Sequence, residues 1–131
     1  MKYSEIIQNV QTTAQIDGKD KAEKAIQATL ETLKERIIGD EASNLAAQLP
    51  EEIGKYLRGR EGQNGEHFSL KEFYQRVGQA EKVDPTTAAT HVRGVFSVLS
   101  AAVSPGEFDD IKNDLSDDYE ELFAASASSQ N

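Results

Sequence analysis

Eight carboxylates and a single base lie between Ser104 and Phe123, which makes this segment the strongest chemical feature of the sequence. Oxygen ligands at this density could bind a divalent cation. They could also imitate a phosphate backbone and occupy a basic site on another macromolecule. Paired acids can also serve as a general acid and a general base. The base is Lys112, and the acids are Glu107, Asp109, Asp110, Asp114, Asp117, Asp118, Glu120 and Glu121.

The spacing and context of these acids argue against a calcium-binding loop and against general acid–base catalysis. No Gly follows correctly spaced acids, so the segment does not match a calcium-binding loop. General acid–base catalysis needs a pocket or a shifted pKa, and the sequence offers no support for either. The helix dipole also favours acids near helix N-termini, so a solvated surface is an alternative explanation. We predict no catalytic, cofactor or metal residues, and a partner-binding surface made of Asp109, Asp110, Asp117, Asp118, Glu120 and Glu121.

Few other residues could carry chemistry. His67 is expected in a loop and His91 on the apolar side of a helix, and the two lack the short spacing of metal-binding histidines. The chain has no Cys, which excludes disulfides, thiolate metal sites and a Cys nucleophile. The stretch GREGQNG has neither the Lys-Ser/Thr pair of a phosphate-binding loop nor a preceding strand, and is typical of a connecting loop.

Composition limits the classes of partner. The chain has 131 residues, enough for one domain with a core, and a formal net charge of −9. That charge repels phosphates, so we predict no nucleic-acid binding; the best basic patch is small and consists of Lys55, Arg58 and Arg60. The first residues lack the apolar run of a signal peptide, and no stretch approaches the roughly 18 apolar residues of a membrane span. We therefore expect a cytoplasmic protein.

The elements that position these residues are predicted to be helices throughout. Apolar residues recur every three or four positions in residues 20–37 and 85–103, and no run alternates as a strand does. Residues typical of helix N-termini occur at the positions that this pattern requires. Ser69 begins a capping box, Asp84 precedes a Pro at the first helical position, and Ser104 offers a third cap. Most aromatic residues fall on core positions of these helices.

The two halves of the chain carry similar patterns. At an offset of about 66 residues, Ile26 aligns with Val92, Glu41 with Glu107, and Leu49 with Leu115. One residue of slip also aligns Ile16 and Asp17 with Val83 and Asp84. We predict one all-α domain of two tandem four-helix repeats, residues 3–58 and 69–124, joined by a loop at 59–68 and followed by a flexible tail at 125–131. The expected helices are 4–14, 20–37, 41–48 and 51–58, then 70–82, 85–103, 105–115 and 117–124.

Four segments in this order resemble the bacterial domain-of-unknown-function family 2267. They are EASNLAAQLPEEIGKYL, FSLKEFYQRV, VDPTTAATHVRGVFSVL and PGEFDDIKNDLSDDYEELF, and the resemblance covers about residues 3–124. The resemblance implies a compact all-helical domain and brings no established catalytic or ligand residues. The second unit departs from the first where Ser116 stands in place of Pro50, so a role of the QLPEE segment would be confined to one half. We expect Ser116 to cap the closing helix of the second unit.

Two functions remain open. The first is a non-catalytic module that binds another protein, as a monomer or homodimer, with Tyr56, Tyr119 and Phe123 as further contacts if they are exposed. The second is a protein, either an enzyme or a non-catalytic binder, that holds a small ligand or a divalent metal in a pocket between the two repeats. A deep pocket that contains His91 or several converging acids would favour the second function.

Overall fold

A computed structural model describes residues 1–123 of the chain, and within them every regular element is a helix. The predicted all-α class is thereby confirmed. The predicted flexible tail, residues 125–131, and the last residue of the predicted second repeat lie outside the described residues.

The first half begins with α1 (Tyr3–Thr13) and the long α2 (Lys19–Arg36), followed by the short α3 (Gly39–Ala46). It closes with α4 (Glu51–Gly54), which tightens directly into the 3-10 helix η1 (Lys55–Leu57). The sequence predicted one helix over 51–58. The last turn narrows instead, as is common at helix C-termini, where terminal carbonyls lack an intrahelical partner.

The second half contains α5 (Leu70–Glu81), the long α6 (Pro85–Ala102) and α7 (Pro105–Asn113). A 3-10 turn, η2 (Asp117–Tyr119), follows, and residues 121–123 are again helical. The predicted helices of this half are therefore present, although the closing one at 117–124 is interrupted after η2.

Three of the four predicted helix caps form. The side chains of Ser69, Asp84 and Ser104 accept hydrogen bonds from the backbone N–H three residues later, at Glu72, Thr87 and Glu107. The prediction that Ser116 caps the last helix was wrong. Its hydroxyl bonds instead to the side chains of Arg36 and Asp118, because tertiary neighbours compete with the local backbone for a short polar side chain.

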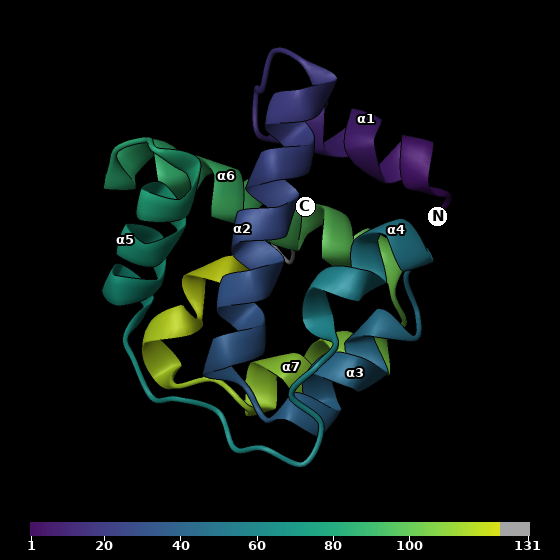
Figure 1. Ribbon diagram of the computed structural model, residues 1–131, viewed down its shortest axis with the longest axis vertical. Coiled ribbons are helices and arrows are strands. Elements are labelled where there is room, and N and C mark those ends of the chain that lie inside the picture. Colours follow the sequence, from purple (N-terminus) through teal and green to yellow (C-terminus); the bar gives the residue numbers. More distant parts are fainter. Residues whose placement is uncertain (124–131) are drawn as a thin grey trace.

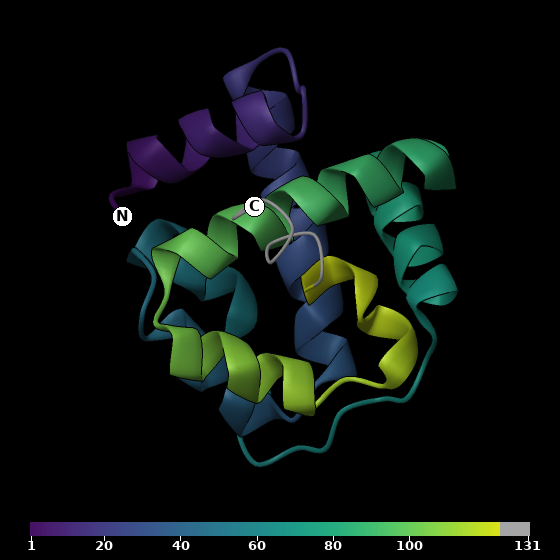
Figure 2. The ribbon, with the colours of Figure 1, turned by 180° about the vertical axis from the view of Figure 1, so that it is seen from behind.

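The two long helices, α2 and α6, cross at the centre of the molecule (Figure 1). Seen from behind, α1 lies along α6 (Figure 2), and on the other side α5 packs against α2. The first helix of each half thus contacts the second helix of the other half. Where the end of α1 meets α6, the two chain segments lie very close together. A Cβ atom at Gly94 on α6 would lie 2.6 Å from the Cβ of Ala14, which follows α1.

The turns after α1 and α5 have the same backbone geometry. Gln15 and Lys82 are the two non-glycine residues with positive φ in the described part of the chain, at 56° and 62°. In each turn the backbone N–H of the next residue donates to the carbonyl five positions back, Ile16 to Gln11 and Val83 to Gly78, both at 2.9 Å. This is the Schellman pattern, which ends a helix sharply and redirects the chain. The two turns bring α2 and α6 back across the molecule.

The helices α3 and α7 are linked by a reciprocal pair of contacts. Asp114, after α7, accepts the backbone N–H of Ile38 at the start of α3, at 2.8 Å. Gln48, after α3, accepts the backbone N–H of Ser104 at the start of α7, also at 2.8 Å. Each helix thus has its first free N–H satisfied by a side chain from the other half.

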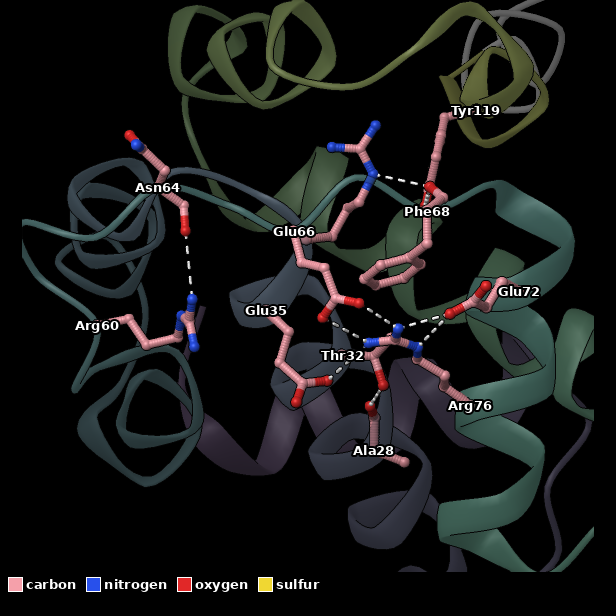
Figure 3. A network of polar contacts seen from close by, with 11 residues as sticks. Ala28, Thr32, Glu35, Arg60, Asn64, Glu66, Phe68, Glu72, Arg76 and Tyr119 are labelled. Atoms are coloured by element: carbon pink, nitrogen blue, oxygen red, sulfur yellow. Dashed lines mark hydrogen bonds and ion pairs between the residues drawn. The ribbon is translucent and has the colours of Figure 1, made fainter.

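The segment between η1 and α5 is held against the helices by two arginines. The guanidinium of Arg76 pairs with Glu66 and Glu72, at 2.7 and 2.5 Å (Figure 3). It also stacks on the Phe68 ring, 3.8 Å from the ring centroid. Buried Arg36 donates to the Phe68 carbonyl oxygen at 2.9 Å, and the Tyr119 hydroxyl donates to the same oxygen at 2.8 Å. Phe68 and Phe73 are in contact, as a hydrophobic staple requires.

Candidate functional site

The acidic segment contributes to a cluster that joins the two halves. One carboxylate oxygen each of Glu41, Glu107 and Asp110 lies within 4.8 Å of the other two. Glu41 comes from the first turn of α3 and the other two from α7. Glu107 is 8% exposed, Glu41 is half-buried and Asp110 is exposed. Of the three, the sequence analysis proposed only Asp110 as a candidate site residue.

The electrostatics of this cluster are unfavourable to ionised carboxylates. Burial, with Glu41 and Asp110 as neighbours, raises the pKa of Glu107 to about 7. Burial also raises the pKa of Glu41, and the charges of Asp110 and Asp114 add to that effect. Each rise has the same physical cause, since desolvation and nearby negative charge both disfavour the ionised form. A proton or another positive charge bound at the cluster would therefore be stabilised by the three carboxylates.

The other candidate partner-binding acids divide into two groups. Asp118 accepts the backbone N–H of Leu70 at 2.7 Å, and Glu121 accepts the Tyr74 hydroxyl at 2.7 Å, so both hold the fold together. Their carboxylates remain exposed at the surface. Asp109, Asp117 and Glu120 are also exposed, and they lie on α7 and around η2.

The aromatic residues considered as partner contacts are not surface groups. Tyr119 is fully buried, and Phe123 is 7% exposed. Tyr56 is half-buried, and its hydroxyl donates to Glu23 at 2.7 Å. Since all three contribute to the packing of the domain, none of them offers an exposed apolar contact to a partner.

A pocket of about 420 Å³ lies between the two halves. Its first wall is the turn after α1 and the start of α2, with Gln15, Ile16, Asp17, Lys21 and Lys24. Its second wall is the turn between α5 and α6 with the adjoining helix ends, and consists of Glu81, Val83, Thr87 and His91. The two Schellman turns therefore face each other across this pocket, and its lining holds two lysines, two acids and one histidine.

The pocket lining contains a close polar contact between His91 and Glu81. His91 Nδ1 lies 2.7 Å from Glu81 Oε1, and the Glu81 side chain is only 4% exposed. The other carboxylate oxygen, Oε2, is buried and has no hydrogen-bond partner. Burial raises the pKa of Glu81, against opposing contributions from His91 and Lys24. A carboxylate oxygen in this position lacks the donor that buried polar atoms normally have.

The remaining predicted candidates stay apart from both sites. His67 is exposed in the segment before α5, as expected of a loop residue. Among the basic residues, Arg58 pairs with Glu51 at 3.3 Å, and Arg60 donates to the carbonyl of Asn64 at 3.2 Å. Lys55 lies over the Tyr56 ring. Two of these three side chains therefore make polar contacts within the fold.

Sequence reasoning missed Glu81 and Glu41 as site residues. The one available signal for Glu41 was its alignment with Glu107 in the comparison of the two halves. Glu81 had no such signal, because nothing in the local sequence distinguishes a buried acid at the end of an amphipathic helix from an exposed one. Its meeting with His91 depends on how α5 folds back onto α6, which spacing alone does not reveal.

Within residues 1–123, no helix combines the length and the apolar character that crossing a membrane requires. A search of curated proteins finds no match. A family model described as "Uncharacterized conserved protein (DUF2267)" matches residues 3–122. That match runs from the first residue of α1 to residue 122, and thus includes both walls of the pocket and α1 to α7. The chain therefore belongs to the DUF2267 family.

Proposed function

We propose that this protein is a non-catalytic helical module that binds a small ligand in the pocket around Glu81 and His91. The observation that carries the proposal is a pocket of about 420 Å³ that contains a buried, half-satisfied carboxylate. Pockets of this size, with a few polar groups converging in them, are the usual form of small-molecule sites. Further support comes from His91, since the sequence associated a pocket that contains this residue with ligand binding rather than protein binding.

The lining indicates the chemistry of the ligand. Lys21 and Lys24 supply positive charge on a chain in which acids outnumber bases, 23 to 14. A local positive group on an acidic surface concentrates small anions there. Glu81 Oε2 needs a hydrogen-bond donor, and His91 can offer Nε2 because Nδ1 is engaged with Glu81. We propose a ligand that carries both an anionic group and a hydrogen-bond donor, such as a hydroxy acid or an amino acid.

Thermal denaturation with a panel of small acids tests this proposal. Glycine, glycolate and inorganic phosphate represent an amino acid, a hydroxy acid and an anion without a carbon skeleton. Binding should raise the melting temperature in proportion to the logarithm of ligand concentration. Lys24→Ala removes one charge from the pocket and should reduce the increase.

Lys71→Ala is the matched control, because Lys71 is an exposed lysine on α5 outside the pocket lining. The control should keep the ligand-dependent increase of the wild type. If no compound of the panel raises the melting temperature, or if both variants respond like the wild type, the pocket is not the binding site.

We also propose that residues 3–58 and 69–124 are two copies of one duplicated unit. The first three helices follow one another in the same order in the two halves. Support comes from the positive φ of Gln15 and Lys82, which lie at matching positions after the first helix of each half. Further support comes from the reciprocal contacts at the starts of α3 and α7, which pair matching positions in both directions. Contacts of this reciprocal kind are characteristic of a two-fold arrangement.

A second candidate function is the binding of a protein partner by the acidic end of a cytoplasmic monomer or homodimer. The observation that favours it is the exposure of Asp109, Asp110, Asp117 and Glu120 near one another in the chain. Exposed charge of one sign steers and orients a partner of opposite charge. Co-purification of the tagged protein from its own cells, beside a variant neutralised at Asp109 and Asp117, tests it. A partner lost with the variant supports the proposal, and an identical set of proteins in both samples contradicts it.

A further inference from the structure

The cluster of Glu41, Glu107 and Asp110 has a local origin in the starts of α3 and α7. Glu41 and Glu107 each occupy the third position of their helix. A glutamate at that position commonly folds back to accept the backbone N–H of the cap residue. Here those two N–H groups, of Ile38 and Ser104, are already bonded to Asp114 and Gln48. Both glutamates are thereby released from capping and turn toward each other across the α3–α7 contact.

The released carboxylates are left without donors. Glu107 is 8% exposed, and its Oε2 is buried with no hydrogen-bond partner. Glu41 Oε1 is in the same condition. None of the ion pairs found in residues 1–123 involves any of the three acids. Removing a buried carboxylate from water without a compensating partner is costly, and the neighbouring negative charges of the cluster repel one another.

We propose that Glu41, Glu107 and Asp110 form a binding site for a hard divalent cation, with Ca²⁺ preferred to Mg²⁺. All three ligand atoms are carboxylate oxygens, which suit hard cations rather than Zn²⁺ or Cu²⁺. Three carboxylates supply enough charge for one divalent ion. Nothing in this proposal depends on the ligand pocket at Glu81, which is lined by different residues.

The preference for Ca²⁺ follows from the coordination habits of the two ions. Ca²⁺ accepts carboxylate oxygens in flexible arrangements, whereas Mg²⁺ demands near-ideal octahedral geometry and gives up its water reluctantly. The three carboxylate oxygens lie within 4.8 Å of one another but come from two different helices, an arrangement that suits the more adaptable ion. An open hollow of about 320 Å³ adjoins the cluster and is lined by Glu41, Asp110, Asn113 and Asp114. This hollow gives access to the water molecules that complete the coordination of a cation held by few protein ligands.

Titration of metal-free protein with CaCl₂, MgCl₂ and KCl at equal ionic strength tests the site. We expect Ca²⁺ to bind with a dissociation constant of about 10⁻⁴–10⁻³ M, as partly solvated sites do. About 10 mM Ca²⁺ should then raise the melting temperature by about 5–10 °C, with a smaller increase for Mg²⁺ and none for K⁺. Calorimetry should give one binding event per chain.

Two variants and one control decide the location of the site. Glu107→Gln and Asp110→Asn each remove one ligand charge and should weaken Ca²⁺ binding by about tenfold or more. Asp109→Asn removes the same charge from an exposed neighbour on α7 and should leave the affinity within about twofold of the wild type. Glu107→Gln also relieves repulsion within the cluster, so this variant should fold at least as stably as the wild type in the presence of chelator.

Two results would overturn the proposal. One is the absence of a Ca²⁺-specific increase in melting temperature up to about 10 mM, which would mean that protons alone neutralise the cluster. The other is an increase that persists equally in Glu107→Gln and Asp110→Asn, which would place any bound Ca²⁺ elsewhere on the acidic surface.

Discussion

The buried guanidinium of Arg36 shows how single residues hold this fold together. Arg36 is 2% exposed and has no carboxylate among its hydrogen-bond partners in the described chain. Its charge is stabilised by the carbonyl oxygen of Phe68, by the Ser116 hydroxyl and by the Tyr119 ring, 5.1 Å from the guanidinium carbon. A buried charge needs such a set of partners, because desolvation would otherwise expel it or unfold its surroundings.

Tyr119→Phe should destabilise the protein by about 1 kcal/mol, because it removes a buried hydroxyl that shares the Phe68 carbonyl with Arg36. Tyr74→Phe is the control, since the Tyr74 hydroxyl bonds to exposed Glu121 and its loss should cost less. Urea denaturation of both variants measures the difference in the free energy of unfolding. Equal losses would contradict the role given to the shared carbonyl.

Asp118 should make stability fall in acid. The Ser116 hydroxyl and the backbone N–H of Leu70 hold the pKa of Asp118 below its usual value of 3.8. A carboxyl whose pKa is lowered in the folded state stabilises that state above its unfolded pKa, and the contribution disappears as pH falls through the folded pKa. The free energy of unfolding should therefore decrease below about pH 4, and Asp118→Asn should flatten this decrease. An unchanged pH profile in the variant would rule out this contribution of Asp118.

At the residue scale, sequence patterns predicted the contacts that form between residues close together in the chain. Ser69, Asp84 and Ser104 cap helices as their positions indicated. The same reasoning failed for Ser116, because Arg36 approaches it from 80 residues away in the chain. The pair of Glu81 and His91 could not be predicted for a related reason. Its two members are only 10 residues apart, but their contact depends on the turn between α5 and α6.

At the scale of elements, the sequence predicted the number, order and approximate bounds of the helices, but not how the connecting segments pack. The segment after η1 lies so close to α3 that a Cβ atom at Gly39 would be 1.7 Å from the carbonyl oxygen of Arg60. The Gly39 N–H also donates to the Gln63 carbonyl at 2.9 Å. The hydrophobic periodicity of the sequence cannot predict contacts of this kind, because they involve the backbone of an irregular segment.

Gly39→Ala should therefore destabilise the protein by about 2 kcal/mol or more, since backbone atoms would have to move to admit the methyl group. Gly106→Ala is the matched control in the first turn of α7, where an added Cβ would meet nothing within 4 Å. That control should be neutral or stabilising, because alanine favours helices more than glycine does. Thermal denaturation of the two variants compares them. Similar melting temperatures would contradict the close approach.

At the scale of the whole molecule, the two halves depend on each other. The helix α1 packs on α6, and α5 packs on α2, so each half covers the long helix of the other. Both proposed binding sites lie where the halves meet. The ligand pocket lies between the two turns that follow α1 and α5, and the cation site lies between α3 and α7. The sequence suggested two similar halves, but it could not show which faces of them come together.

Fragments 1–64 and 65–131 should each be largely unfolded alone, because each exposes the apolar face of a long helix that the other half covers. Mixed in equal amounts, they should recover the helical circular dichroism and the cooperative melting of the intact chain. A fragment that melts cooperatively by itself would show that the halves are independent units.

The central claim is that a small ligand binds at Glu81 and His91, and the chain contains an internal control for it. Of its two histidines, His91 lines the pocket and His67 is exposed in the segment before α5. The direct measurement is the NMR spectrum of both imidazole rings during titration with glycolate and glycine at constant pH. We predict that the His91 signals shift and saturate while the His67 signals stay in place. Signals of both rings that remain still, or that move together, would contradict the claim.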